Sequence, residues 1–398
     1  MAGIYIHIPF CKSRCIYCDF YSTTCKEYIP KYIDALTREL IFRADYLQTG
    51  GRLPDIGTIY IGGGTPSLLD TAHIHRILDI IYKVYPVSEQ AEITMEANPD
   101  DLTERKIREL RLLPVNRLSM GIQTFDDEKL QLLHRRHRGK QAADTVRACQ
   151  DAGFDNISID LIYGLPRQTL ADWKYDLERA IELNTQHISA YSLTYEEGTP
   201  IWTMREKRTV TEADEELSLD MFKLLTDRLS AARFEHYEIS NFAKEGFRSR
   251  HNSSYWEGIP YLGCGPSAHS FDGHSRQWNC ADLHTYINRV TSCHRPDDFA
   301  DASWIQKEDL TVYESYNDCI VTALRTSKGV NLHSLRERFG NRLADYCMEN
   351  ARPHIQRGTL EIVETKKKHT PEGMLKLTRR GIFLSDDIMC DLLYIEDD

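Results

Sequence analysis

Short apolar runs rich in β-branched residues alternate with longer amphipathic stretches along the first 235 residues of this chain. The apolar runs predict six strands, at residues 3–8, 56–61, 91–95, 116–121, 155–160 and 187–192. The intervening stretches have helical periodicity, at residues 27–48, 71–84, 103–112, 126–151, 170–183 and 214–232. Strands that alternate with helices pair in parallel through right-handed crossovers, so the pattern predicts one parallel sheet covered by helices.

The number of strand-helix units limits the fold class. Six units are fewer than the eight that close a TIM barrel, so we predict an α/β fold with a partial (β/α)6 TIM-type barrel over residues 1–235. The chain has 398 residues, more than one core usually supports. We predict a connecting segment at residues 236–300 and a small, mostly helical C-terminal domain at residues 301–398.

The predicted strands have one apolar face and one polar face. In the first strand Ile4, Ile6 and Ile8 share one face, while Tyr5 and His7 share the other. The third, fourth and fifth strands likewise oppose apolar residues to polar or small ones. Bulky branched side chains fill an ordinary barrel interior, so a polar interior predicts a barrel that holds a polar ligand.

Special residues cluster where the predicted strands end. Gly62, Gly63, Gly64 and Thr65 follow the second strand, Glu96 to Pro99 the third, Gly121 to Gln123 the fourth, and Asp160 ends the fifth. Ligands of parallel α/β folds bind at the carboxyl ends of strands, and glycines let the backbone approach a ligand closely. These strand ends predict a binding site on one rim of the barrel.

Three cysteines, Cys11, Cys15 and Cys18, follow the first strand with C-x3-C-x2-C spacing. Three thiolates can hold three irons of a cubane cluster and leave the fourth iron open for a ligand. The spacing alone also allows a closed zinc site, with Cys25 or His7 as the fourth ligand. The eleven cysteines are an odd number and no secretory signal precedes them, so a disulfide framework is disfavoured.

Composition excludes some classes of protein. A net charge of −11 argues against a mainly electrostatic nucleic-acid binder. No apolar stretch approaches the ~20 residues of a membrane helix, so stable membrane insertion is not expected. We predict a soluble cytoplasmic protein, in which the basic residues 366–369 form a solvated turn.

The segment from Tyr5 to Cys18 resembles the cluster-binding loop of radical S-adenosylmethionine (SAM) proteins. Together with the strand-end motifs, it is most similar to the branch that contains oxygen-independent coproporphyrinogen III dehydrogenase and HemW-type haem chaperones. The resemblance implies a [4Fe-4S] cluster on Cys11, Cys15 and Cys18, with SAM on its open iron. The residues it implies around SAM and the cluster are Tyr5, Tyr17, Gly63, Gly64, Thr65, Glu96, Gln123, Arg135 and Asp160.

One position separates the two members of this branch. The dehydrogenases of this branch have a fourth cysteine two residues after the third, whereas this chain has Phe20 at that position. A phenylalanine has no thiol for radical or proton chemistry. We therefore predict a haem chaperone that delivers haem to acceptor haemoproteins and uses an electron donor such as a flavodoxin or ferredoxin. Oxidative decarboxylation of coproporphyrinogen III, or radical SAM chemistry on another substrate, are the alternatives.

A second motif, H-N-x-x-Y-W at residues 251–256, also resembles the haem-chaperone branch. Imidazole is a common axial ligand of haem iron, and aromatic rings offer flat surface for a porphyrin. The candidate haem-binding residues are His251, Tyr255, Trp256, His236 and His269. For any one of these histidines, the alternative is a packed domain junction in which the ring is hydrogen-bonded to protein.

Overall fold

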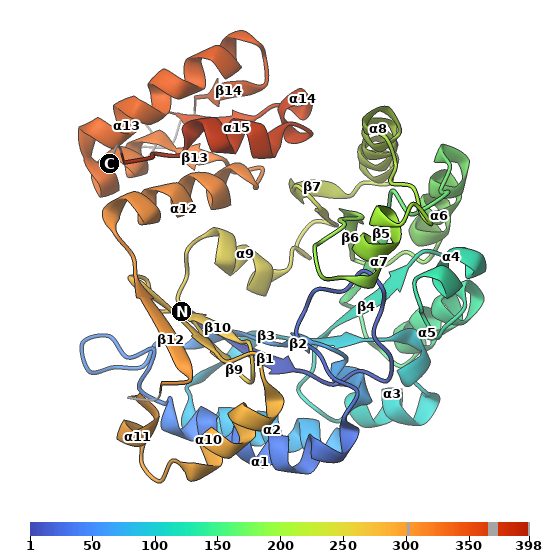
Figure 1. Cartoon of the computed structure of the whole chain (residues 1–398), viewed down its shortest axis with the longest axis vertical. Helices are drawn as coiled ribbons and strands as arrows, with labels where there is room; N and C mark the ends of the chain where they lie inside the picture. The colour runs from blue at the N-terminus through green and yellow to red at the C-terminus, as the bar shows by residue number, and fades with distance from the viewer. Residues whose placement is uncertain (301–302, 365–372, 397–398) are drawn as a thin grey trace.

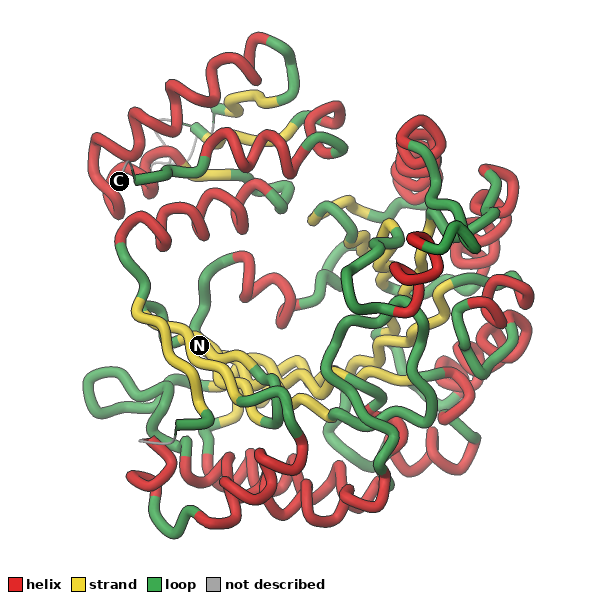
Figure 2. The backbone as a smooth tube through the Cα atoms, viewed as in Figure 1, coloured by secondary structure: helices red, strands yellow, loops and turns green. Residues whose placement is uncertain are grey.

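The structure, a computed structural model, describes residues 1–300, 303–364 and 373–396 (Figure 1). Its centre is a twelve-stranded sheet with the order β12-β11-β10-β9-β1-β2-β3-β4-β5-β6-β8-β7. The sheet curves into an open trough rather than a closed barrel (Figure 2). The basic residues 366–369 lie outside the described residues.

The six predicted strands are present, parallel and in sequence order. They are β1 (Ala2–Ile8), β2 (Ile56–Gly63), β3 (Val87–Ala97), β4 (Arg117–Gln123), β5 (Ile157–Tyr163) and β6 (His187–Ser192). The predicted α/β class and partial barrel are therefore confirmed. The predicted parity also holds in β1, because Ile4, Ile6 and Ile8 are fully buried in the main core beneath the helices.

Helices cover the convex face of this sheet (Figure 1). They are α1 (Ile29–Phe42), α2 (Thr71–Val84), α3 (Glu104–Leu110), α4 (Asp127–Leu132), α5 (Gly139–Asp151), α6 (Leu170–Glu182) and α8 (Glu215–Ala231). Short 3-10 turns precede or follow some of them: η1 (Lys26–Tyr28), η2 (Pro66–Leu68) and η3 (Pro99–Asp101). The short α7 (Pro200–Glu206) was not predicted from the sequence.

The stretch 126–151, predicted as one helix, is two helices. A left-handed residue, His134 (φ 58°), ends α4, and the Arg135 amide donates back to the Leu130 carbonyl. Gly139 then starts α5, where an added Cβ would collide with the Phe125 carbonyl. The prediction of a continuous helix was wrong because backbone packing between residues 125 and 139 overrides the local helical periodicity.

Residues 236–300 extend the sheet at both edges. β7 (Glu235–Glu238) and β8 (Asn241–Ala243) follow β6, and β9 (Tyr261–Cys264) pairs in parallel with β1. β10 (His269–Phe271) and β11 (Ser275–Asn279) continue outward as antiparallel strands, and β12 (Ile305–Asp309), beyond residue 300, pairs antiparallel with β11 at the edge. The same region holds α9 (Arg250–Trp256), α10 (Leu283–Ser292) and α11 (Pro296–Ala300). The domain boundaries at 235 and 300 stay predictions.

The C-terminal unit, residues 312–364 and 373–396, has its own apolar core. Its elements are α12 (Val312–Leu324), β13 (Val330–Asn331), α13 (Leu332–Gln356), β14 (Leu360–Val363), β15 (Met374–Leu377), α14 (Arg379–Ile382) and α15 (Ser385–Leu392). It faces the trough, with α9 between the two (Figure 1). No helix in the described part of the chain is both long and apolar enough to cross a membrane.

Candidate functional site at the cysteine loop

The cysteine loop, residues 9–25, is fastened at the end of β1. The Cys11 amide donates to the Thr23 carbonyl (2.9 Å), and the Thr23 amide donates to the Pro9 carbonyl (2.6 Å). At its middle, Ile16 is buried in a small apolar cluster with Leu133 and Ile201. These contacts fix both the ends and the middle of the loop, so the three thiols between them occupy defined positions.

The Cys11 thiol is buried, and the Cys15 and Cys18 thiols are half-buried. Burial raises the pKa of Cys18 to about 11, and the neighbouring Cys15 and Cys11 raise it further. Thr65 Oγ1 donates to Cys11 Sγ (3.4 Å), and Arg135 Nη1 donates to Cys15 Sγ (3.5 Å). Burial raises the pKa of Cys11, and the hydrogen bond from Thr65 opposes this by stabilising the thiolate, the form that ligates a metal.

The thiols do not form a site for one ion. Within residues 1–300, 303–364 and 373–396, no three His, Cys, Asp or Glu side chains converge closely enough to hold a single metal. Zinc at ~2.3 Å from each sulfur would draw its ligands tightly together. A cubane cluster does not need its three thiolates to converge on one point, since each sulfur would bind a different iron.

The glycine turn after β2 packs directly on the cysteine loop. Gly64 donates to the Ile8 carbonyl (2.7 Å), and Thr65 donates to the Phe10 carbonyl (2.8 Å). A Cβ on Gly64 would lie 2.9 Å from each of the Ile8 and Phe10 carbonyl oxygens and 3.1 Å from Cys11 Sγ. Glycine is therefore required here, because the backbone lies directly against the cysteine loop and the Cys11 thiol at this point.

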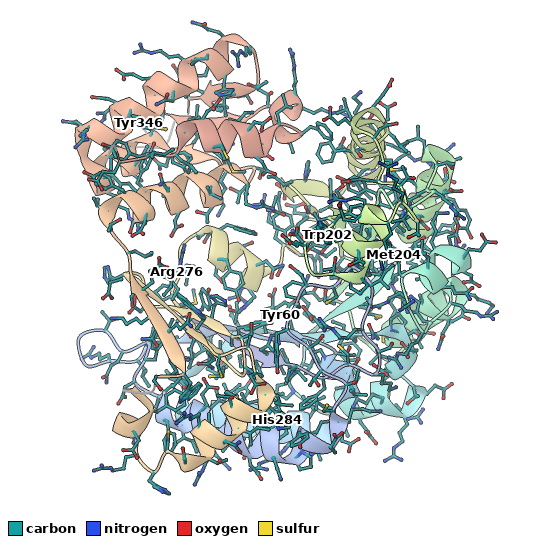
Figure 3. All side chains as sticks on the ribbon, in the orientation of Figure 1. Tyr60, Trp202, Met204, Arg276, His284 and Tyr346 are labelled. Carbon is teal, nitrogen blue, oxygen red and sulfur yellow. The ribbon has the colours of Figure 1, made fainter. Side chains whose placement is uncertain are left out.

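Glu96 forms one wall of the site. Tyr60 OH donates to Glu96 Oε1 (2.8 Å), and the Gly63 amide donates to Oε2 (3.0 Å). Tyr5 stacks on Tyr60 with ring centroids 6.1 Å apart. Tyr60 lies on the concave side of the sheet, toward α9 (Figure 3). The wall thus presents a carboxylate and two aromatic rings to the interior.

Arg135 forms the opposite wall. The break after α4 turns it inward, where Nη2 donates to Asn98 Oδ1 (2.7 Å) and to the Gly121 carbonyl. A Cβ on Gly121 would lie 2.8 Å from Gln123 Nε2 and 3.2 Å from Arg135 Nη2, so Gln123 borders the same space. Burial raises the pKa of Tyr17, while the neighbouring Arg135 lowers it and the neighbouring Cys15 raises it.

Asp160 lies on β5 between these walls. Ser119 Oγ is 3.4 Å from both of its carboxylate oxygens, and burial raises the pKa of Asp160 to about 6. Arg117 is buried, and its positive charge lowers the pKa of both Glu96 and Asp160, against the larger effect of burial. Arg117, Tyr60 and Asn98 were not predicted as site residues, although the parity of their strands or a strand-end motif could have indicated them.

The motif histidine His251 lies deeper in the trough, beneath Tyr60. Its Nδ1 hydrogen-bonds with Thr58 Oγ1 (2.8 Å) and its Nε2 with Tyr255 OH (2.8 Å). Its ring stacks on Tyr60 with centroids 5.0 Å apart, and only 1% of its surface is exposed. Both ring nitrogens are therefore occupied by protein partners.

The other two candidate histidines lie apart from the motif. His236 on β7 hydrogen-bonds with the Ile239 carbonyl (2.9 Å) and stacks on Phe242 at 4.2 Å. His269 on β10 is exposed and stacks on Trp278 at 5.7 Å. The structure therefore brings the predicted SAM residues together at one rim. Of the predicted haem residues it brings only His251, Tyr255 and Trp256 together, on α9.

Glu96 makes stability depend on pH. Burial raises the pKa of its carboxyl from an ordinary 4.5 to about 7. Between these two pKa values the folded protein keeps a proton on Glu96 that the unfolded chain releases. The contribution of Glu96 to the free energy of unfolding therefore falls as the pH rises. Without SAM, the fall in melting temperature between about pH 5 and about pH 8 is expected to be smaller in Glu96→Gln than in the parent. Equal falls in both proteins would contradict the prediction.

Two family comparisons match this architecture. Residues 5–180 match the radical SAM superfamily, and residues 310–384 match the HemN C-terminal domain. The solved structure of coproporphyrinogen III oxidase (HemN) from Escherichia coli, a radical SAM enzyme, has a TM-score of 0.81 and 24% identity. That likeness covers 98% of this chain and 89% of that chain, and it shows a shared fold. The class is therefore a radical SAM protein with a HemN-type C-terminal domain.

Curated relatives narrow the class. The chain is 33% identical over 390 residues to the Heme chaperone HemW of Bacillus subtilis (strain 168), covering 98% of both chains. It is 38% identical over 269 residues to the Heme chaperone HemW of Escherichia coli (strain K12), covering 67% of this chain and 69% of that one. The chain belongs to the HemW family of radical SAM proteins.

Proposed function

We propose that this protein is a haem chaperone of the radical SAM type, which binds haem and delivers it to acceptor haemoproteins. Its cysteine loop would hold a [4Fe-4S] cluster through Cys11, Cys15 and Cys18. The chemistry that such a cluster supplies when bound is one-electron reduction of SAM at the sulfonium. A flavodoxin or ferredoxin is the proposed class of electron donor.

The charges of the rim support SAM as the second ligand. SAM carries a cationic sulfonium, an ammonium and a carboxylate. Glu96 and Asp160 would face the positive groups, and the Arg135 guanidinium would face the carboxylate. The remaining proposed contacts are Tyr5, Tyr17, Gly63, Gly64, Thr65 and Gln123. The glycine turn has no Cβ atoms, so its backbone lies directly against the cysteine loop, where its N–H groups would be close to a ligand of the loop.

The observation that carries the chaperone assignment is Phe20. Phe20 is 64% exposed within the cysteine loop, at the position where the dehydrogenase of this branch would have a cysteine. A phenyl ring neither transfers a proton nor donates a hydrogen atom as a thiol does, so porphyrinogen oxidation is disfavoured. The HemW relatives support the same conclusion. The proposed haem contacts are among His251, Tyr255, Trp256, His236 and His269.

Anaerobically reconstituted protein tests the proposal when it is given haem or coproporphyrinogen III, with SAM and a reductant. The expected result is saturable haem binding, transfer of haem to an apo-haemoprotein, and no protoporphyrinogen. Formation of protoporphyrinogen would instead assign the chain to porphyrinogen oxidation. Cleavage of SAM coupled to a third compound would indicate a radical SAM enzyme with another substrate.

Arg135 and its neighbour Arg136 offer a matched pair for the SAM site. Arg135→Met removes the guanidinium between Asn98 and Cys15, and the SAM dissociation constant is expected to rise about tenfold. Arg136 pairs with Asp100 at 2.5 Å, so Arg136→Met is expected to leave SAM affinity unchanged. Equilibrium dialysis with cluster-loaded protein measures both. Equal affinities in the two variants would remove Arg135 from the proposed site.

A further inference from the structure

A second pocket lies at the opposite end of the strands from the cysteine loop. It has a volume of about 440 Å³ and is bordered by Ala2 and Gly57, at the beginnings of β1 and β2. Its other side is formed by α9 and by Ala323, Thr326 and Gly329 of the C-terminal unit. The pocket therefore lies between the floor of the trough and the C-terminal unit, and it is large enough for a bound organic molecule.

The motif tryptophan Trp256 lines this pocket together with Met1 and Ile259. Arg325, which follows the end of α12, holds its guanidinium 5.1 Å from the centre of the Trp256 ring. The indole Nε1–H is buried, and no described residue accepts a hydrogen bond from it. A buried indole N–H usually has a partner, so this one indicates an unfilled site.

The rim of the pocket is cationic although the chain is acidic overall. Arg248, Arg250 and Lys328 border it, and Glu257 is the one acid among the described lining residues. Arg248 pairs with Glu235, and Lys328 pairs with Glu257, in partly exposed ion pairs that a ligand carboxylate can replace. Arg250 Nη1 donates to the Gln90 carbonyl (2.6 Å), and its backbone amide donates to Glu92 Oε2 (3.0 Å). Its guanidinium forms no ion pair among the described residues.

We propose that this pocket binds haem, with the apolar face of the macrocycle against Trp256 and Ile259 and its propionates toward Arg250 and Lys328. The inference rests on the proposed function, and it identifies where the cargo of a haem chaperone would lie. A flat, apolar ring with two carboxylates at one edge combines the properties of the pocket: an aromatic wall, an unpaired N–H and a rim of cations.

The lining residues predict how the ligand is recognised. None of the described lining residues is His or Cys, and most of the binding energy is expected from the ring and the carboxylates rather than from an iron ligand such as Met1 or Tyr237. Metal-free protoporphyrin IX is therefore expected to compete with haem. Protoporphyrin IX dimethyl ester, which keeps the ring but loses both charges, is expected to compete poorly.

The test uses full-length, cluster-loaded protein under anaerobic conditions, titrated with haem and followed by absorbance. The double variant Arg250→Gln with Lys328→Gln is expected to raise the haem dissociation constant about tenfold or more. The control, Lys140→Gln with Arg147→Gln, removes two exposed cations from α5 and is expected to change it less than about twofold. Trp256→Leu should weaken haem and metal-free porphyrin alike.

The outcomes separate this inference from the proposed function. If the parent protein binds no haem, the chaperone proposal itself is overturned. If the parent binds haem and the Arg250 and Lys328 double variant binds it equally well, haem lies elsewhere and the pocket inference alone is overturned. Equal competition by the dimethyl ester would also overturn it, because the cations would then contribute nothing.

Discussion

Cys15→Ala is expected to abolish the iron–sulfur cluster, lowering iron from about four atoms to below about one per chain. Cys15 lies in a loop that is fixed at both ends, so no other thiol can move into its place without breaking the contacts of Ile16 with Leu133 and Ile201. The variant also removes the sulfur to which Arg135 donates. Iron and sulfide analysis after anaerobic reconstitution measures the effect, together with the charge-transfer absorbance of the cluster.

Cys25 provides the matched control. It is a half-buried free thiol near the end of the same loop, and its backbone amide donates to Thr23 Oγ1 (3.2 Å). Cys25→Ala is expected to keep the full complement of iron, since three thiolates suffice for a cluster with an open iron. A cluster that survives in Cys15→Ala, or disappears in Cys25→Ala, would show that the ligand assignment is wrong.

The second large effect concerns the junction between the trough and the C-terminal unit. Glu238 on β7 is 2% exposed and accepts two hydrogen bonds from Arg325, at 3.1 Å and 2.9 Å. Arg325→Met would leave this buried carboxylate without its cation, so the free energy of unfolding is expected to fall by about 3 kcal/mol. Urea unfolding followed by circular dichroism and by Trp fluorescence measures the loss.

Arg379→Met tests whether burial is the reason. Arg379 also joins the C-terminal unit to the trough, by pairing with Asp227, but both side chains are more than half exposed. Exposed pairs contribute little, so a loss below about 1 kcal/mol is expected. Similar losses in the two variants would mean that burial of Glu238 does not set the strength of the junction.

Periodicity predicted much of the fold because it reports burial directly. The β1 run could be assigned to a strand, and its faces could be distinguished, since Ile4, Ile6 and Ile8 alternate with Tyr5 and His7. The rim of the site followed from the same reasoning, because parallel strands bring their carboxyl ends to one edge. For this reason Glu96, Gln123 and Asp160 could be predicted as neighbours despite their separation along the chain.

The sequence pattern did not predict the elements whose positions depend on contacts with residues far away in the chain. The break between α4 and α5 depends on the close approach of Gly139 to the Phe125 carbonyl, which no helical periodicity records. The short strands between residues 235 and 279 have too few residues for a clear alternation. Their places at the two edges of the sheet depend on pairing with β1 and β6, which lie far away in sequence.

The sequence by itself determined the chemistry that the cysteine loop can perform. The spacing of the three thiols is a local covalent property, and so is the presence of Phe20 in place of a fourth cysteine. Tertiary structure alone decided where the side chains of the H-N-x-x-Y-W motif lie. One short helix directs His251 and Tyr255 onto the polar floor of the trough and Trp256 toward the second pocket. Their roles differ because the surfaces that contact α9 come from segments hundreds of residues apart.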